Sequence, residues 1–459
     1  MQINPSIFRE YDIRGYIDKD LSTDFAFLLG RAYANLCKEN SINNISIGFD
    51  CRLTSRSYAD QLAKGMAEQG INSTITGMGP TPQLYWSLFN HDFGGGIQVT
   101  GSHNPKDMNG FKISLGRKSL FGEAIQDLKQ RMIKLKDIEL KPETGSINEI
   151  DIQPEYIQDL IKISKDKMGE RKLKVVIDAG NGVGGTPGIK VLEGLGVEVI
   201  DLYCDPDGDF PNHHPDPTEV KNLVDLIKAV KENNADFGIG FDGDADRIGV
   251  VDENGEVIFG DILLTIYSKE VLKEKPNANI IADVKCSSRL FDFINQNGGN
   301  GIMCQTGHSL VKNRLIETKG ELAGEMSGHI FFKHRFYGFD DAIHCAARLV
   351  EIVSNHKGPF SDLIKDIPKM ESTPEIRVDC SDDIKFEIAK KAQSAFKDFE
   401  TDNIDGVRIN FENGWGLIRA SNTQPVLVLR FEADTIENLN QYQKLVTGRL
   451  EDIKASISG

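Results

Sequence analysis

Residues 237–252, Phe-Gly-Ile-Gly-Phe-Asp-Gly-Asp-Ala-Asp-Arg-Ile-Gly-Val-Val-Asp, place a loop of three carboxylates between two short apolar runs. The apolar runs are typical of strands, so the loop is predicted to join two strands of a sheet. Asp242, Asp244 and Asp246 alternate along the loop, so their carboxylates can converge on one divalent cation. Without a cation, acids this close repel one another, which favours a metal site over a solvated turn.

An EF-hand is the main structural alternative for this loop. Glu253 stands where the twelfth residue of an EF-hand loop places a carboxylate. The sixth position must be glycine for the sharp turn, but Arg247 stands there. The flanks are also predicted strands rather than helices, and we therefore exclude an EF-hand.

The wider pattern alternates strands with helices. Residues 45–50, 175–178 and 280–283 are β-branched runs that end in Asp and are followed by turn residues. Between them, residues 22–37 carry apolar side chains at steps of three and four behind a Ser/Thr cap, which predicts a helix. This alternation indicates an α/β protein with a largely parallel sheet.

A faint internal repeat runs through the first three quarters of the chain. Each unit has a strand ending in Asp, a second strand, and a third strand that opens into a polar loop. After Pro368 the pattern changes to α+β, with alternating strands at 406–411, 415–419 and 426–431. We therefore predict four domains, at residues 1–148, 149–252, 253–366 and 367–459.

Composition limits the possible functions. The chain has 459 residues and a net charge of −16, which argues against general binding to nucleic acid or anionic membranes. No apolar run approaches the roughly 18 residues of a membrane span, and the first residues lack the order of a signal peptide. The seven cysteines include no Cys-x-x-Cys pair, so neither a disulfide framework nor a zinc knuckle is predicted. We expect a reduced, cytoplasmic protein.

Three further loops can carry chemistry. Thr-Gly-Ser-His-Asn-Pro (100–105) offers Ser102 as a nucleophile beside His103, although a plain Ser/Thr-rich turn is the better explanation of the triplet when it is taken alone. Gly-Glu-Met-Ser-Gly-His (324–329) offers Glu325 and Ser327 to sugar hydroxyls and His329 for proton transfer, and a loop that only satisfies its own backbone is an equal alternative. Arg-Ala-Ser-Asn-Thr-Gln-Pro (419–425) is suited to cradle a phosphate, with an ordinary hydrophilic turn as the alternative.

Two other polar segments are interpreted as turns. The glycines at 180, 182, 184 and 185 do not match the spacing of a dinucleotide-binding loop, so they predict a tight strand–helix turn. Residues 205–209, Asp-Pro-Asp-Gly-Asp, resemble the acidic loop, but the nearby prolines and the lack of a following Arg favour a plain surface turn.

Together the four loops resemble those of the α-D-phosphohexomutase family, and within it the bacterial phosphomannomutase/phosphoglucomutase branch. The resemblance extends from Phe-Arg-Glu-Tyr-Asp-Ile-Arg-Gly (8–15) to residue 433 and so covers nearly the whole chain. Arg-Ala-Ser-Asn-Thr-Gln-Pro and Thr-Gly-His (306–308) point to the mannose/glucose branch. Phosphoglucosamine mutases typically have Gln where Met326 stands and Ser-Gly-Thr-Glu-Pro in the cradle.

The resemblance implies a fold of three similar α/β domains with mixed sheets and a C-terminal α+β domain around a central active-site cleft. It implies a reversible exchange of phosphate between O1 and O6 of a hexose, with Ser102 carried as phosphoserine and a 1,6-bisphosphate as intermediate. One Mg²⁺ per subunit would be held by Asp242, Asp244, Asp246 and the phosphoserine of Ser102, and a hexose 1,6-bisphosphate would act as activator.

The resemblance also assigns roles to individual residues. The catalytic group besides Ser102 would be Arg14, Lys112, Arg247 and His329. The substrate-binding residues would be Tyr11, His103, Lys285, Gly307, His308, Glu325, Ser327, Arg419, Ser421, Asn422 and Thr423. The expected partner is a hexose phosphate, with no nucleic acid and no membrane, and the protein is expected to be a monomer.

Three alternatives stay open. A phosphoglucosamine mutase would share the reaction but prefer an amino sugar. A Mg²⁺-dependent sugar phosphatase would use water in place of the sugar hydroxyl, and a catalytically silent protein would only bind a metal or a sugar phosphate.

Overall fold

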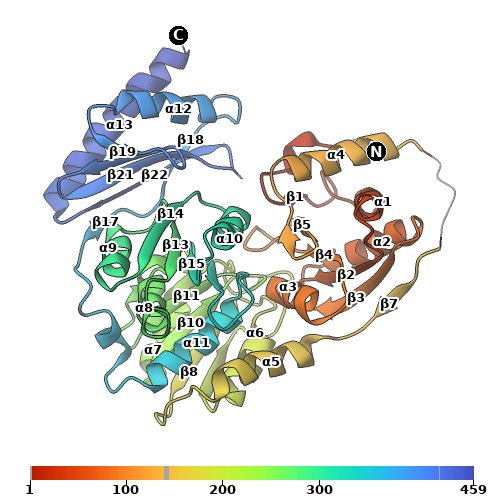
Figure 1. Ribbon diagram of the computed structural model, residues 1–459, viewed down its shortest axis with the longest axis horizontal. Coiled ribbons are helices and arrows are strands. Elements are labelled where there is room, and N and C mark those ends of the chain that lie inside the picture. The colour runs from red at the N-terminus through yellow and green to blue at the C-terminus, as the bar shows by residue number, and fades with distance from the viewer. Residues whose placement is uncertain (1–2, 139–143, 423, 459) are drawn as a thin grey trace.

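The computed structural model describes residues 3–138, 144–422 and 424–458, and it contains four sheets that follow one another along the chain. We refer to the parts that carry these sheets as domains I to IV. Domain I lies to one side, domains II and III lie together, and domain IV lies above domain III (Figure 1). Among the described residues, no helix is long and apolar enough to cross a membrane.

Domain I has a mixed sheet in the order β1-β5-β4-β2-β3-β7, with β6 paired to β5. Ser22 caps the first long helix by accepting the N–H of Phe25, which confirms the helix predicted behind this cap. The strands are β1 (Ile13–Tyr16), β2 (Asn44–Phe49), β3 (Asn72–Met78), β4 (Gly95–Val99), β5 (Met108–Leu115), β6 (Lys118–Ser119) and β7 (Ile147–Glu149). The helices are η1 (Pro5–Ile7), α1 (Thr23–Glu39), α2 (Ser55–Ala67), α3 (Thr81–Asn90) and α4 (Glu123–Leu135).

Domain II has a five-stranded sheet in the order β12-β11-β10-β8-β9. The first strand ends at Asp178 and turns directly into a helix that begins at Gly185, so the glycine-rich segment is a strand–helix turn as predicted. The strands are β8 (Lys174–Asp178), β9 (Glu198–Leu202), β10 (Phe237–Phe241), β11 (Ile248–Asp252) and β12 (Val257–Ile258). The helices are α5 (Gln153–Lys165), α6 (Gly185–Gly194), η2 (Val220–Leu223) and α7 (Val224–Asn233).

Domain III has a four-stranded sheet in the order β14-β13-β15-β16. Its strands are β13 (Asn279–Asp283), β14 (Asn300–Cys304), β15 (Leu322–Gly324) and β16 (Ile330–Phe332). Its helices are α8 (Gly260–Glu274), α9 (Ser288–Gln296), α10 (His308–Glu317), α11 (Ala342–Ser354) and η3 (Phe360–Leu363).

Domains I to III share one topology, which confirms the repeat that the sequence suggests. The shared strand orders are β5-β4-β2-β3, β11-β10-β8-β9 and β16-β15-β13-β14. In each set the first three strands along the chain are parallel and the fourth is antiparallel. The polar loop of each domain therefore occupies the same place, where the third strand turns back into the fourth.

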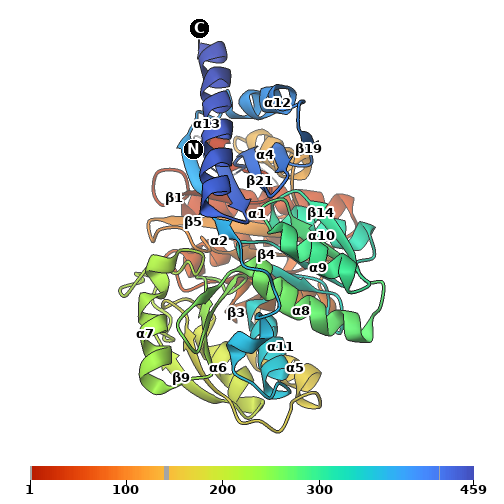
Figure 2. The same cartoon turned by 90° about the vertical axis from the view of Figure 1, so that its left-hand side faces the viewer.

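Domain IV is an antiparallel sheet packed against two helices, as the change of pattern after Pro368 predicts. The strand order is β17-β22-β21-β20-β19, with β18 also paired to β22. The strands are β17 (Glu371–Ser372), β18 (Ile376–Asp379), β19 (Glu400–Asp402), β20 (Val407–Phe411), β21 (Gly414–Ala420) and β22 (Val426–Ala433). The helices are α12 (Lys385–Ala395) and α13 (Ile436–Ser458), and Figure 2 shows α13 standing at one end of the molecule.

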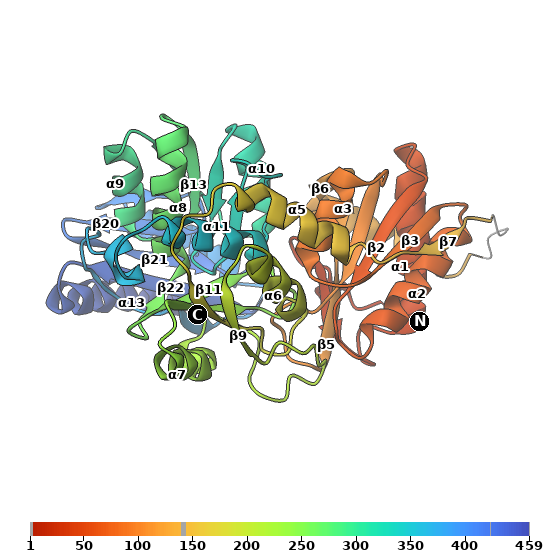
Figure 3. The same cartoon turned by 90° about the horizontal axis from the view of Figure 1, so that it is seen from below.

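Domains II and III share one continuous hydrophobic core. Helix α11 of domain III packs against α5 and α6 of domain II, and side chains of both sheets belong to the same buried cluster. The hydroxyl of Tyr156 in α5 also donates to the carboxylate of Asp341 at 2.9 Å. Seen from below, α5 and α11 lie side by side at this junction (Figure 3). The polar loops of these two domains are therefore held in a fixed relation.

Domain IV contacts domain III through charged side chains that are buried. Arg408 lies over the ring of Trp415 at 3.8 Å and donates to the carbonyls of Val284 and Cys286 at 2.8 Å each. Glu432 accepts hydrogen bonds from Trp415 Nε1 and Ser287 Oγ at 2.9 Å each. This contact places the cradle loop of domain IV near the site loops of domain III.

Candidate active site

The four polar loops leave the carboxyl ends of strands in the four sheets. The loops follow β4 in domain I, β10 in domain II, β15 in domain III and β21 in domain IV. Hydrogen bonds between side chains of domains I, II and III join the first three loops, as described below. The carboxyl ends of parallel strands are a common place for ligand sites in α/β proteins.

Ser102 lies in a buried turn and faces the acidic loop of domain II. Its hydroxyl donates to Oδ2 of Asp242 at 2.9 Å and lies 3.1 Å from Nδ1 of His103. The Ser102 side chain is 2% exposed, and its φ of 50° is left-handed, a conformation that costs a residue with a Cβ about 1–2 kcal/mol. Strain at a polar side chain often marks a functional position.

The three carboxylates of the acidic loop converge, as the spacing predicts. One oxygen from each of Asp242, Asp244 and Asp246 lies within 4.8 Å of the others, and all three side chains are fully buried. Burial raises the pKa of Asp242 well above its ordinary value, and its two neighbours raise that pKa further. Oδ1 of Asp244 and Oδ1 of Asp246 have no hydrogen-bond partner among the described residues. Buried, converging and partly unpartnered carboxylate oxygens fit a hard divalent cation.

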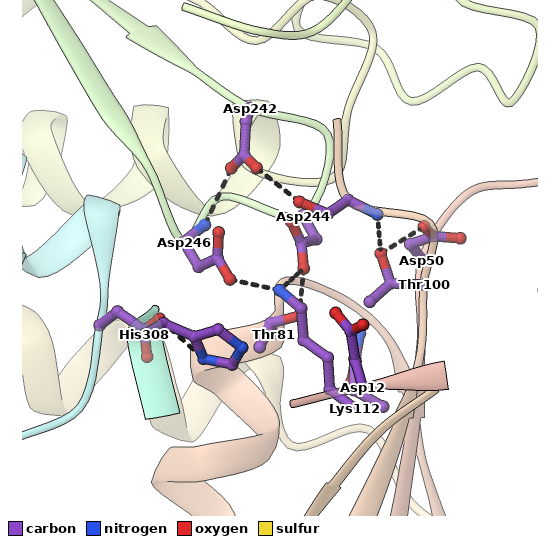
Figure 4. A network of polar contacts seen from close by, with 12 residues as sticks. Asp12, Asp50, Thr81, Thr100, Lys112, Asp242, Asp244, Asp246 and His308 are labelled. Atoms are coloured by element: carbon purple, nitrogen blue, oxygen red, sulfur yellow. Dashed lines mark hydrogen bonds and ion pairs between the residues drawn. The ribbon is translucent and has the colours of Figure 1, made fainter. Parts of the chain in front are cut away.

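Lys112, on β5 of domain I, inserts its ammonium group into this cluster. Nζ donates to Asp244 Oδ2 at 2.6 Å and to Asp246 Oδ2, and the hydroxyl of Thr81 donates to the same oxygen of Asp244 at 2.5 Å (Figure 4). Burial by itself would lower the pKa of Lys112, but Asp244 and Asp246 outweigh that effect and raise it well above its ordinary value. A lysine predicted beside the reacting phosphate thus also binds the predicted metal ligands.

Two arginines lie near His103, whose ring contacts the Ser102 hydroxyl. Burial lowers the pKa of His103 well below its ordinary value, and the nearby charges of Arg247 and Arg14 lower it further. Arg14 is held by the carboxylate of Asp12 at 2.6 Å. Arginines gathered near a neutral imidazole and a hydroxyl are suited to an anion such as a phosphoryl group.

His329 is held at both ring nitrogens. Nε2 accepts from Nε of Arg247 at 3.0 Å, and Nδ1 lies 3.1 Å from Oδ2 of Asp340. Burial would raise the pKa of Asp340, but Lys312 and His329 outweigh burial and lower it below its ordinary value. An ionised carboxylate at Nδ1 orients the ring and leaves Nε2 as the proton acceptor.

The domain III loop brings the predicted sugar-binding residues together. Oε1 of Glu325 accepts the backbone N–H of Gly307 at 2.6 Å, and burial raises the pKa of Glu325. The rings of Tyr11 and His308 meet edge to face at 5.1 Å. Gly307 has φ 135°, and a Cβ there would lie 2.9 Å from Tyr11, so the position requires glycine. Ser327 follows in the same loop and is half-buried.

Two predicted ligand-binding residues, Arg419 of the cradle and Lys285, pair with carboxylates in this structure. Nε of Arg419 donates to Asp405 at 2.8 Å, and Nζ of Lys285 donates to Glu375 at 2.7 Å. Lys285 lowers the pKa of Glu375 to about 2, although burial opposes that shift. The remaining predicted cradle residues follow Arg419: Ser421 Oγ accepts the N–H of Gln424 at 3.1 Å, Asn422 is half-buried, and Thr423 lies outside the described residues.

Several residues of the site are not identified by the sequence analysis. Asp12 holds Arg14, Asp340 holds His329, and Thr81 binds Asp244. None of these residues lies in the four loops, and each approaches the site from another element of the fold. The sequence offers one local indication of Asp340, because two adjacent acids, at 340 and 341, follow a stretch rich in aromatic residues. Acids next to such a stretch are expected to be buried, and a buried carboxylate requires a partner.

Comparison with known proteins identifies the family. Family models described as phosphoglucomutase/phosphomannomutase match four consecutive parts of the chain: alpha/beta/alpha domain I at residues 5–137, domain II at 154–255, domain III at 259–370 and the C-terminal domain at 375–448. A Pseudomonas syringae pv. tomato protein named phosphomannomutase/phosphoglucomutase is 44% identical over 98% of this chain and 96% of its own length. A Neisseria meningitidis serogroup A protein named phosphoglucomutase is 44% identical over 96% of each chain.

A solved structure agrees with the sequence comparisons. The Burkholderia thailandensis phosphoglucomutase/phosphomannomutase family protein superposes with a TM-score of 0.92 at 39% identity, over 99% of this chain and 98% of its own. The chain therefore belongs to the phosphoglucomutase/phosphomannomutase family of α-D-phosphohexomutases and is an isomerase of that class. The predicted fold, three α/β domains and a C-terminal α+β domain, is confirmed.

Proposed function

We propose that this protein interconverts the 1-phosphates and 6-phosphates of mannose and glucose, through phosphoserine at Ser102 and a hexose 1,6-bisphosphate. The observation that carries the proposal is the buried hydroxyl of Ser102, hydrogen-bonded to Asp242. Phosphoryl transfer depends on positioning and charge neutralisation more than on covalent help, and this hydroxyl has both carboxylate metal ligands and basic side chains around it. The names of the Pseudomonas and Neisseria relatives support the choice of mannose and glucose.

Asp242, Asp244 and Asp246, together with an oxygen of the phosphoserine, would hold one Mg²⁺ per subunit. The bound ion would offset negative charge at the reacting phosphorus. The two unpartnered oxygens of Asp244 and Asp246 are the observation that favours this assignment. A hexose 1,6-bisphosphate would act as activator by phosphorylating Ser102 whenever the enzyme loses its phosphate.

In the first half of the reaction the free hydroxyl of a hexose 1-phosphate attacks the phosphorus on Ser102. The bond from phosphorus to Ser102 Oγ breaks, and the hydroxyl proton passes to Nε2 of His329. Lys112 and Arg14 neutralise the serine oxygen as it leaves. Arg247 has to release Nε2 of His329 before this nitrogen can take the proton, because Nε2 accepts a hydrogen bond from Arg247 in the resting structure. The bisphosphate then reorients in the site, so that its other phosphate faces Ser102. This phosphate passes to Ser102, and His329 gives its proton back to the sugar oxygen.

The residues of domains III and IV would hold the sugar in both orientations. Glu325 would accept and Ser327 would donate hydrogen bonds with sugar hydroxyls. These hydroxyls present a similar arrangement in the two orientations of the bound sugar. Lys285 and His308 would contact the ligand beside Glu325 and Ser327. Tyr11 and Gly307, which lie next to each other, would line the same part of the site. The cradle residues Arg419, Ser421, Asn422 and Thr423 would grip the phosphate that is not reacting.

Arg419→Ala is expected to weaken substrate binding more than it slows the chemistry. One bidentate contact between arginine and phosphate contributes about 1.5–3 kcal/mol, so KM for glucose 1-phosphate should rise roughly 10- to 150-fold. Steady-state kinetics would measure the change. Arg449→Ala is a suitable control, because Arg449 is another domain IV arginine and pairs with Asp398 at 2.6 Å on an outer helix. An unchanged KM in Arg419→Ala would remove Arg419 from the cradle.

Asp340→Asn is expected to lower kcat by roughly 100-fold or more, because the amide no longer fixes the proton of His329 on Nδ1. KM should change less than kcat, since Asp340 lies closer to the proposed proton acceptor His329, at 3.1 Å, than to the proposed substrate-binding residue His308, at 3.6 Å. Asp341→Asn is the matched control: its carboxylate accepts from the backbone of His344 at 2.8 Å and caps α11. Asp341→Asn should lower thermal stability and leave kcat near the wild-type value. Equal kcat values for Asp340→Asn and the wild type would show that His329 needs no carboxylate.

The proposed substrates are tested by ³¹P NMR on the purified protein with Mg²⁺ and a trace of glucose 1,6-bisphosphate. Mannose, glucose and glucosamine 1-phosphates would be supplied in separate samples. We expect the first two to become 6-phosphates without release of inorganic phosphate. Faster conversion of glucosamine 1-phosphate would indicate a phosphoglucosamine mutase, steady phosphate release a phosphatase, and no conversion in any sample a binding protein.

We also propose that the domain limits lie at residues 148, 252 and 366, that the protein is a monomer and that it is located in the cytoplasm. The net charge of −16 favours a protein without nucleic-acid or membrane partners.

A further inference from the structure

Arg52 lies outside the four site loops, shortly after β2, and its side chain is 3% exposed. Its guanidinium donates four hydrogen bonds to backbone carbonyls of the segment that carries Ser102. Nη2 donates to the carbonyl of Ser102 at 2.8 Å and to that of Asn104 at 2.6 Å. Nη1 donates to the carbonyls of Pro105 at 2.7 Å and Met108 at 3.0 Å. One side chain thus binds the whole turn between β4 and β5.

The position of this guanidinium is itself fixed by Asp50 at the end of β2. Nε of Arg52 lies 3.3 Å from Asp50 Oδ2, and the backbone N–H of Arg52 donates to Asp50 Oδ1 at 3.0 Å. The same carboxylate accepts the hydroxyl of Thr100 at 2.7 Å (Figure 4). It also accepts the N–H of Gly101 at 3.3 Å. Asp50 therefore holds the beginning of the turn and orients the arginine that holds the rest.

The turn predicted at residues 205–209 of domain II covers this arrangement. The Phe210 ring lies 5.0 Å from Cζ of Arg52, within range of a cation–π contact. A Cβ on Gly208 would lie 2.5 Å from the carbonyl oxygen of Cys51, so the two backbones are in close contact. A Cβ on Gly101 would lie 2.6 Å from Cζ of Arg52, which shows how closely the turn packs on the guanidinium. The arginine has no room to adopt another position.

The serine needs such support because its backbone is not in a relaxed conformation. Ser102 has φ 50°, and its N–H is held by Oγ1 of Thr100 at 2.8 Å. The carbonyl of Ser102 also contacts domain II, since a Cβ on Gly243 would lie 2.5 Å from that oxygen. Residues in sparsely populated backbone conformations persist only where their surroundings fix them.

We propose that Arg52 is a positioning residue that holds Ser102 in line for phosphoryl transfer, with Asp50 and Phe210 fixing its guanidinium. The proposal rests on the proposed function, in which Ser102 carries the phosphate. Four of the five N–H donors of Arg52 are used on backbone carbonyls, and the fifth, on Nε, is buried beside Asp50 without a hydrogen bond, so no donor is exposed to substrate. Arg52 therefore acts on the reaction only through the turn.

This role predicts a specific kinetic signature. Loss of the Arg52 guanidinium should displace Ser102 and lower kcat by about 100-fold, because a displacement of about 1 Å in a reacting group can lower a rate that much. KM for glucose 1-phosphate should stay within about threefold of the wild-type value, because most of the proposed substrate contacts lie in domains III and IV, away from this turn. A merely structural role would instead lower thermal stability and leave kcat per folded molecule unchanged.

The experiment compares Arg52→Ala and Arg52→Lys with Arg56→Ala in the full-length protein with Mg²⁺. Arg56 is a matched control, because it lies four residues further on, is 46% exposed, and pairs with Asp60 and Glu149 on the surface. For each variant we would measure kcat and KM for glucose 1-phosphate, the melting temperature, and the recovery of kcat on addition of guanidinium chloride at non-denaturing concentration.

We expect Arg56→Ala to behave as the wild type and Arg52→Ala to lose kcat at constant KM, with part of the loss restored by guanidinium. Arg52→Lys keeps the charge but cannot reach four carbonyls, so it should also lose kcat. If Arg52→Ala does not fold, Arg52→Lys alone decides: a reduced kcat supports the proposal, and a wild-type kcat overturns it. A wild-type kcat in folded Arg52→Ala, or a loss that guanidinium leaves unchanged, would also overturn it.

The controls separate this proposal from the proposed function. Mutase activity in the wild type and in Arg56→Ala, together with undiminished kcat in the Arg52 variants, would overturn only the role of Arg52. Absence of mutase activity in the wild type itself would instead contradict the proposed function.

Discussion

Ser102→Ala should reduce mutase activity at least about 1,000-fold, the scale of loss that removal of a nucleophile causes in enzymes with covalent intermediates. The hydroxyl of Ser102 is the group that accepts and returns the phosphate, and alanine offers no atom that can replace it. No described hydroxyl besides that of Ser102 donates to Asp242, so another residue cannot take over the transfer without rearrangement.

The fold should tolerate this change. Ser102 contributes one side-chain hydrogen bond to Asp242, worth about 1 kcal/mol, and no packed apolar surface. The measurements are the initial rate with glucose 1-phosphate and the melting temperature, with Ser119→Ala on the outer strand β6 as a serine control. If Ser102→Ala kept more than about a tenth of the wild-type rate, the phosphate acceptor would have to lie elsewhere.

Removal of divalent cations should abolish most of the activity, and addition of Mg²⁺ should restore it. Asp242, Asp244 and Asp246 are buried within 4.8 Å of one another, and only one lysine ammonium, that of Lys112, pairs with them among the described residues. Without a cation the charge on the reacting phosphate and on these acids stays uncompensated, so we expect a loss of at least about 100-fold after treatment with EDTA. Mg²⁺ should also raise the melting temperature of the protein, because it binds the folded site.

Asp244→Asn tests the same site by mutation. The amide keeps a partner for the hydroxyl of Thr81 but removes one ligand charge, so calorimetry should show Mg²⁺ binding weakened roughly tenfold or more. Asp201→Asn, an exposed acid on β9 of the same domain, is the matched control and should bind Mg²⁺ as the wild type does. Full activity after exhaustive chelation, with Mg²⁺ affinity equal in both variants, would place the cation elsewhere or make it unnecessary.

The parts of the fold that were predictable are those with a local cause. The strands that end at Asp178 and Asp283 and the helix behind Ser22 follow from β-branched runs, turn residues and a capping serine, all within a few residues. The shared topology of the first three domains was only suggested, because strand order depends on which strands pair, and pairing is not encoded in local spacing.

The same division applies to the site. The convergence of the three acids on one point follows from their alternation in one loop, and the structure places them together as predicted. The partners Asp340, Thr81 and Arg52 could not be found in this way, because each comes from an element distant in sequence and meets the site only when the domains pack. The pairing of Lys112 with the acidic loop likewise joins residues more than 130 positions apart.

The most direct test of the account follows the phosphate itself through a single turnover. The enzyme would be labelled with ³²P from labelled glucose 1,6-bisphosphate, freed of sugar, and mixed with excess unlabelled mannose 1-phosphate and Mg²⁺. We expect the label to leave Ser102 and to appear first in mannose 1,6-bisphosphate and then in mannose 6-phosphate. Label that stays on the protein, or that is released as inorganic phosphate at the rate of substrate loss, would contradict it.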